Sequence, residues 1–97
     1  MTITCPGCSH PVPFADFIEA CSAYSPALGT VRWSCPSCGS TTDFRPVEGA
    51  VQVGYVYAAG TAHFAAMETV PVPGLTTERR AAHLVVTHGT SRWTITH

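Results

Sequence analysis

Cys5-Pro6-Gly7-Cys8 and Cys35-Pro36-Ser37-Cys38-Gly39 are the two stretches that decide how this chain folds. Each holds a C-x-x-C pair with a proline after its first cysteine. The proline ring presets φ near −65°, which starts a tight turn and brings the second sulfur alongside the first. Together the two pairs supply four thiolates, a set of soft ligands that suits tetrahedral zinc or iron.

The fifth cysteine and a nearby histidine are weaker candidates for metal ligands. Cys21 shares an apolar helical stripe with Phe14, Phe17 and Ile18, so we expect it to be a small buried side chain. His10 can replace a ligand in principle, but four cysteines already fill a tetrahedron. The predicted metal ligands are therefore Cys5, Cys8, Cys35 and Cys38.

The two pairs resemble the metal knuckles of zinc-ribbon and rubredoxin-like proteins, which read C-P-x-C and C-P-x-C-G. The resemblance covers residues 3–45 and implies a metal site, but it says little about function. Trp33 and the second pair are similar to the second knuckle of rubredoxins, which carry iron and pass single electrons. Rubredoxins have aromatic residues just after the first pair, where this chain has residues 9–13, Ser-His-Pro-Val-Pro. We therefore expect zinc, with iron as the alternative.

The sequence between the knuckles predicts one helix. Apolar residues recur at helical spacing from Phe14 to Tyr24, and Pro13 suits the first helical position. Ser25-Pro26 ends the pattern. Such a helix is expected to cover the metal end of a sheet.

The rest of the chain predicts strands, from alternating apolar residues and turn signals. The connection Pro71-Val72-Pro73-Gly74 is predicted to be stiff and exposed. The expected strands are residues 30–33, 51–57, 62–70, 76–80, 83–87 and 92–96, with a helical turn as the alternative for 76–80.

These elements predict an α+β fold that is mostly antiparallel β, in a single domain of residues 1–97. A zinc-ribbon-like metal-binding half, residues 1–45, contains the helix and packs on a small antiparallel sheet formed by residues 46–97. A metal ion is a common way to stabilise a domain with so small a core.

Composition excludes several classes of function. The net charge is −1 and lysine is absent, so only Arg79-Arg80 offers phosphate contacts and we expect no nucleic-acid partner. No apolar run is long enough for a membrane span or a signal peptide, and reduced C-x-x-C pairs suit the cytoplasm. No catalytic motif is present, and a second metal site on His63 and His83 is only conceivable. We expect no enzyme activity and no catalytic residue.

Two classes of function remain, and a third is less favoured. The first is a structural zinc protein that binds another protein, or a second copy of itself, through the hairpin at residues 50–67. That hairpin has no Asp, Glu, Lys or Arg between Ala50 and Met67. Tyr55, Tyr57, Phe64 and Met67 suit an aromatic-rich interface, and the alternative is that they belong to the core. The alternatives are rubredoxin-like electron transfer by iron and, behind it, a nucleic-acid-binding zinc ribbon.

Overall fold

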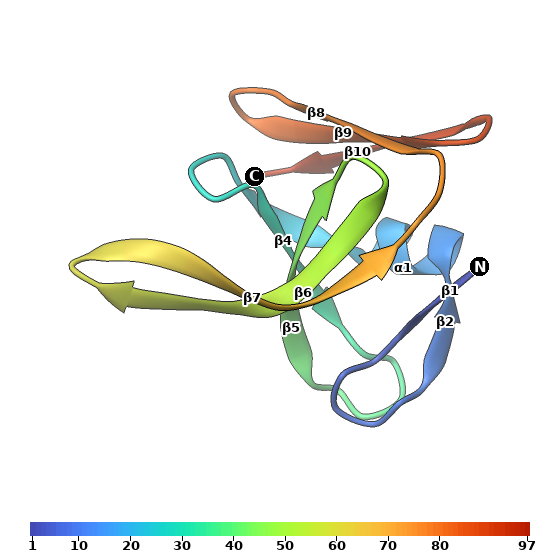
Figure 1. The fold of residues 1–97 in the computed structure, drawn as a ribbon, viewed down its shortest axis with the longest axis horizontal. Coiled ribbons are helices and arrows are strands. Elements are labelled where there is room, and N and C mark those ends of the chain that lie inside the picture. The colour runs from blue at the N-terminus through green and yellow to red at the C-terminus, as the bar shows by residue number, and fades with distance from the viewer.

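The computed structural model describes all of residues 1–97, and most of them lie in antiparallel strands. Strands account for 60% of the chain and helix for 7%. The predicted α+β class is therefore wrong: this is a β protein whose one helix, α1 (Phe14–Ala20), has only 7 residues. Figure 1 shows three sheets wrapped around a common interior, with α1 at one side.

The largest sheet has five strands in the order β3-β4-β5-β6-β7. Its middle strand, β5, pairs with β4 on one side and β6 on the other and runs through residues 45 and 46. The expected arrangement of a metal-binding half packed on a separate small sheet is therefore wrong as well. The strands are β3 (Ser22–Ser25), β4 (Thr30–Ser34), β5 (Thr41–Val47), β6 (Ala50–Ala59) and β7 (Thr61–Pro71).

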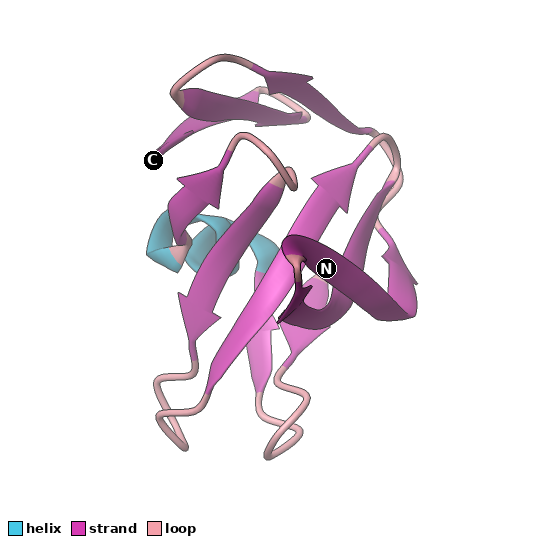
Figure 2. Cartoon of the chain, turned by 90° about the vertical axis from the view of Figure 1, so that its left-hand side faces the viewer, coloured by secondary structure: helices cyan, strands magenta, loops and turns pink.

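Two smaller sheets flank the large one. The N-terminal pair, β1 (Thr2–Thr4) and β2 (Pro11–Pro13), carries the first knuckle in its loop. The C-terminal sheet has the order β10-β9-β8 and confirms the three strands expected after residue 75. Its strands are β8 (Leu75–Arg79), β9 (His83–His88) and β10 (Ser91–Thr96). Figure 2 shows this sheet lying across the end of the large sheet opposite the knuckle loops.

The helix ends earlier than its apolar spacing predicts. It stops at Ala20, and Cys21, with ψ 143°, already has extended backbone. Tyr24 is buried, as expected of the stripe, but it lies on β3, which pairs with β4. A helix this short gains little from its own hydrogen bonds, so pairing with a neighbouring strand decides where it ends.

An aromatic cluster forms the centre of the core and connects the elements. Phe17 of α1 packs against Phe44 of β5 and Trp33 of β4, with ring centroids 4.8 Å and 5.6 Å away. Phe14 meets Trp93 of β10 at 6.1 Å and so ties the C-terminal sheet to the helix. The helix therefore sits between sheets and contacts β1, β2 and β4.

The proline-rich connection after β7 was predicted to be exposed, but part of it is buried. Val72 has 0% exposure. Its N–H donates to the carbonyl of Gly49, whose own N–H donates to the carbonyl of Leu75. The β5–β6 turn thereby fastens the connection and the start of β8 to the large sheet.

Strands β6 and β7 extend beyond the rest of the large sheet as a two-stranded arm. Pairing of β5 with β6 ends at Asp43 and Gly54, whereas pairing of β6 with β7 continues to Ala59 and Thr61. We call residues 55–66 the hairpin arm, and Figure 1 shows it projecting from the body of the molecule. A β-bulge marks its base, because the register passes from Val53↔Glu68 to Gly54↔Ala66.

Gly54 allows the two strands of the arm to cross closely at the bulge. A Cβ at this position would lie 2.0 Å from the carbonyl oxygen of Ala65, a backbone atom that cannot move aside alone. We expect Gly54→Ala to lower the free energy of unfolding by about 1–3 kcal/mol, the usual cost of forcing an atom into a packed site.

Chemical denaturation measures this cost, with Gly60→Ala as the control. Gly60 lies at the arm's tip with φ +96°, and an added Cβ meets no atom within 4 Å. Gly60→Ala therefore lowers the free energy of unfolding only through the strain of a side chain at positive φ. A Gly54→Ala protein no less stable than Gly60→Ala would contradict the close crossing.

Candidate metal centre

The structure brings together the sulfur atoms of Cys5, Cys8, Cys35 and Cys38. All four Sγ atoms lie within 4.8 Å of one another. The two knuckle loops that carry them, β1–β2 and β4–β5, lie side by side at the lower end of the molecule in Figures 1 and 2. Residues that are far apart in sequence therefore form one cluster.

The spacing of the sulfur atoms fits a tetrahedral metal ion. Bonds of about 2.3 Å from zinc to sulfur require sulfur atoms about 3.8 Å apart in a tetrahedron. The Cys5 and Cys38 sulfurs are 3.8 Å apart, and those of Cys8 and Cys35 are 3.7 Å apart. Four close thiols can thus hold a metal ion, and their softness suits zinc or iron.

The two knuckles have the same backbone geometry. In the first knuckle the Gly7 N–H donates to the Cys5 sulfur at 3.4 Å. In the second, the Ser37 N–H donates to the Cys35 sulfur at the same distance. One further backbone bond closes each turn, donated by Ser9 in the first knuckle and by Gly39 in the second, both at 2.9 Å. Such N–H groups stabilise thiolates, as a metal site requires.

Each knuckle begins buried and ends at the surface. Cys5 and Cys35 are 1% and 3% exposed, whereas Cys8 and Cys38 are exposed. Ile3 and Trp33, each two residues before the buried cysteine, are themselves 1% exposed. The core thus fixes the incoming strand of each knuckle and leaves the tip in solvent.

Ser40 and Gly7 belong to the site and were missed by the sequence analysis. The Ser40 hydroxyl lies 2.9 Å from the Cys38 sulfur and 3.8 Å from that of Cys5. Gly7 lets the knuckles close, since a Cβ there would lie 2.9 Å from the Ser40 oxygen. The available signal was a small hydroxyl residue directly after Cys38-Gly39.

The other sequence candidates lie apart from the cluster. Cys21 is buried, and its thiol donates to the Phe17 carbonyl at 3.3 Å. The exposed His10 takes part through its backbone, and its carbonyl accepts the Cys5 N–H. His63 bonds to Thr61 and stacks on Tyr57, and it forms no metal-binding group with His83.

The thiols of the cluster differ in acidity. Desolvation opposes ionisation of Cys5, but hydrogen bonds, led by the N–H groups of Cys8 and Gly7, outweigh it and lower the pKa to about 6. The hydroxyl and N–H of Ser40 lower the pKa of Cys38. The His10 N–H lowers the pKa of Cys8, but desolvation and the neighbouring thiols raise it on balance to about 11. Four thiolates this close repel one another, so full ionisation needs a bound cation.

No protein-family model matches the chain, and neither the curated proteins nor the solved structures include a significant match. The structure also has no helix long and apolar enough to cross a lipid bilayer.

The two knuckles differ at the residue after their second cysteine, and this difference can be tested. Ser9 has φ +62° and Gly39 has φ +74°, so both occupy the left-handed region that favours glycine. We expect Gly39→Ala to lower the free energy of unfolding by about 1 kcal/mol, because a Cβ is strained at this φ. Ser9→Gly removes a comparable strain and should not destabilise the protein.

Thermal unfolding of the metal-loaded variants distinguishes the two changes, with metal content measured in parallel. Gly39 has no atom within 4 Å of an added Cβ, so its substitution reports strain and not a clash. Equal destabilisation by both substitutions would show that the two knuckles do not share one backbone geometry.

Proposed function

We propose that this chain is a small non-enzymatic protein in which a structural zinc ion stabilises a β fold that binds a protein partner through its hairpin arm. The observation that carries the zinc part is a group of four cysteine sulfurs that all lie within 4.8 Å of one another, two pairs of them 3.7 Å and 3.8 Å apart. Four thiolates fill a tetrahedron and leave no open position for substrate, which is the pattern of a structural site.

Zinc is favoured over iron by the surroundings of the first knuckle. The knuckle is followed by Ser9 and His10, both exposed and neither apolar, where rubredoxins carry aromatic residues. Bound at this place, the ion would supply a crosslink and positive charge. It would tie the loop of the β1–β2 pair to the loop between β4 and β5.

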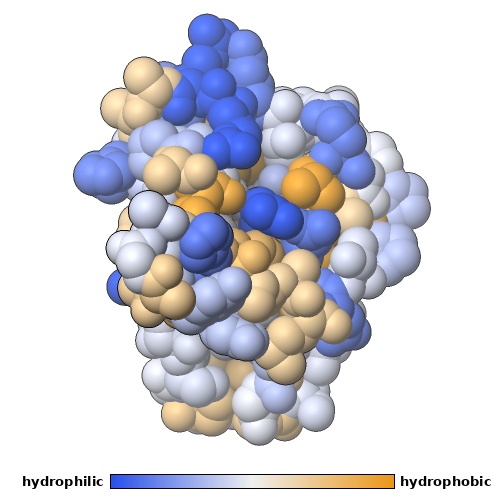
Figure 3. All heavy atoms as spheres, turned by 60° about the vertical axis from the view of Figure 1, so that its left-hand side comes forward, coloured by the Kyte–Doolittle hydropathy of each residue, from blue (hydrophilic) through white to orange (hydrophobic).

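The hairpin arm supports the interaction part of the proposal. A two-stranded hairpin is at best marginally stable alone in water, and beyond Gly54 neither strand pairs with anything else in the chain. Tyr55 and Tyr57 are 51% and 45% exposed, and Met67 at the bulge is 75% exposed. Figure 3, turned toward the side from which the arm projects, shows pale and tan atoms over much of this face, with deep blue atoms mainly at the top and in patches near the middle. The arm offers weakly polar, uncharged surface.

A second copy of the chain is the partner we propose. Strand β7 is the edge of the five-stranded sheet, has 11 residues and bears no charge from Thr61 to Met67. Edges of this kind pair with other strands unless charges or prolines block them. Two β7 edges can pair antiparallel about a two-fold axis, the commonest symmetry of soluble oligomers.

The metal is tested by elemental analysis of protein purified without chelators. We expect one zinc ion per chain, loss of zinc in Cys38→Ser and full zinc in Cys21→Ala. Cys21 lies outside the cluster, so its substitution should cost only about 1 kcal/mol of stability. A red protein that contains iron would contradict the zinc assignment, and metal loss in Cys21→Ala would contradict the ligand set.

Self-association is tested by sedimentation at several protein concentrations. Ala62 is exposed on the arm, so Ala62→Lys should leave the monomer stable but place a charge in the proposed dimer. We expect dimer formation to weaken by about tenfold or more, since an unpaired buried charge costs several kcal/mol. Thr94→Lys, on an exposed position of β10, adds the same charge elsewhere and should keep the dimer. A wild-type protein that stays monomeric at high concentration would contradict the proposal.

A further inference from the structure

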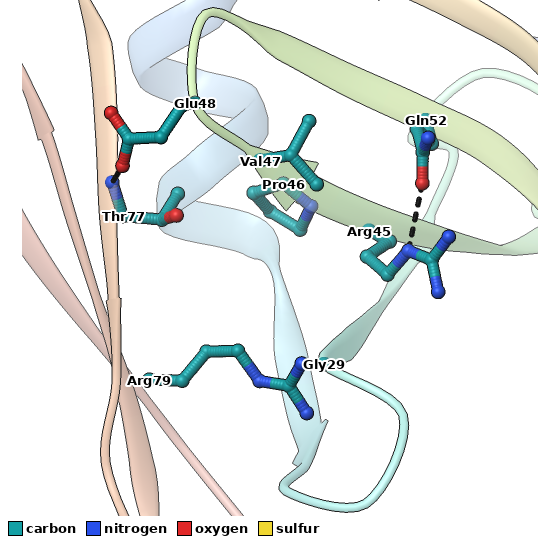
Figure 4. A pocket seen from close by; sticks show the side chains of 8 residues that line it. All are labelled: Gly29, Arg45, Pro46, Val47, Glu48, Gln52, Thr77 and Arg79. Carbon is teal, nitrogen blue, oxygen red and sulfur yellow. Dashed lines mark hydrogen bonds between the residues drawn. The ribbon is translucent and has the colours of Figure 1, made fainter.

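A hollow of about 380 Å³ lies where the large sheet faces the C-terminal sheet, and three charged side chains are among the residues that line it. Arg45 of β5 and Arg79 of β8 both line it, although they are far apart in sequence (Figure 4). Glu48, in the β5–β6 turn, and Gly29, before β4, complete its rim.

Arg79 is held in place by backbone and not by an acid. Its Nη2 donates to the carbonyl of Pro26 at 2.7 Å. The guanidinium lies against Gly29, where an added Cβ would be 3.0 Å from Arg79 Cζ. This anchoring fixes the group and leaves its Nε and Nη1 without an acceptor in the protein.

Arg45 is positioned in a similar way from the other side. Its Nε donates to the Oε1 atom of Gln52 at 2.7 Å, a bond drawn in Figure 4. Its Cζ lies 4.9 Å from the centre of the Phe64 ring, an arrangement typical of a cation–π contact. Both Nη groups remain without a protein acceptor, so the outer edge of this guanidinium is free.

Arg45 and Arg79 differ from two other arginines in that neither forms an ion pair with a carboxylate. Arg80, adjacent to Arg79 in sequence, pairs with Glu78 at 2.6 Å, and Arg32 pairs with Asp43 at 3.6 Å. The expected Arg79-Arg80 cluster is thus divided. Glu48, the acid in the hollow, uses one oxygen to accept the Thr77 N–H at 2.9 Å, and Figure 4 shows it turned away from Arg45. Two guanidinium groups therefore face this hollow with no carboxylate bound to either.

We propose that this hollow binds the phosphoryl group of a small phosphate monoester. Guanidinium groups present parallel N–H donors that match the oxygens of phosphate, and their charge strengthens each bond. Two such groups, approaching from β5 and β8, suit a dianion with three terminal oxygens better than a carboxylate, which has two. The volume of the hollow exceeds that of phosphate alone and leaves room for the rest of the molecule.

The probe for this site is inorganic phosphate, titrated into the full ¹⁵N-labelled protein in its metal-loaded form. We expect the Nε–H signals of Arg45 and Arg79 to shift and saturate together. Acetate at the same ionic strength should bind at least about tenfold more weakly, as expected when one set of charge-assisted bonds is lost. No saturable shift, or acetate binding as tight as that of phosphate, would overturn the proposal.

Two variants and a control make the test specific to the hollow. Arg45→Gln and the charge-preserving Arg79→Lys should each weaken phosphate binding about tenfold. Arg92→Gln removes an exposed charge outside the hollow and should leave binding unchanged. Backbone amide spectra and metal content verify that each variant is folded. Equal weakening by Arg92→Gln would show that phosphate is attracted nonspecifically by positive charge. Unchanged binding in Arg79→Lys would show that the paired N–H donors of the Arg79 guanidinium do not bind the phosphate.

Discussion

The approach of four thiols at the end of two β-hairpin loops is the contact on which much of this fold depends. It holds together the loop of a short N-terminal pair of strands and a loop of the five-stranded sheet, which share no backbone ladder. Strands β1 and β2 have only 3 residues each, too few to be stable through their own pairing. A cation at this point would remove the repulsion among thiolates and make the crosslink strong.

The aromatic core acts together with that crosslink. Ile3 and Trp33 enter the core two residues before Cys5 and Cys35, so the position of each knuckle follows from packed side chains. Phe17 and Phe44 then connect the helix to the middle of the large sheet, with ring centroids 4.8 Å apart. Core packing thus positions the strand before each knuckle, and that strand positions the knuckle turn and its cysteine sulfurs. The cluster and the core are therefore parts of one structure.

The hairpin arm has a different character. The arm extends beyond the bulge, and past Gly54 its two strands form a backbone ladder only with each other. Next to its base, Arg45 is held against Phe64 and Gln52, which belong to β7 and β6. Phe64 of the arm and Gln52, which precedes the arm on β6, therefore also position one of the two arginines in the hollow. A change that distorts the base of the arm is expected to disturb that guanidinium as well.

Local chemistry in the sequence determined the knuckles, the ligand candidates and most strands. Proline after the first cysteine, a small residue after the second and alternating apolar residues act over a few positions, so they can be read without a structure. Even there, Ser9 adopts the positive φ that Gly39 adopts more easily, because the closing hydrogen bonds of both turns are the same.

Tertiary structure alone decided the rest. The helix stops at Ala20 because β3 pairs with β4, and the two expected halves form one sheet because β5 pairs on both sides. Ser40 approaches Cys5 across the two knuckles, and Arg79 of β8 lines one hollow with Arg45 of β5, through contacts between distant elements. Arg80 instead pairs with Glu78, its neighbour in sequence. Strand pairing and side-chain packing join residues that no local pattern connects, so only the folded chain reveals these sites.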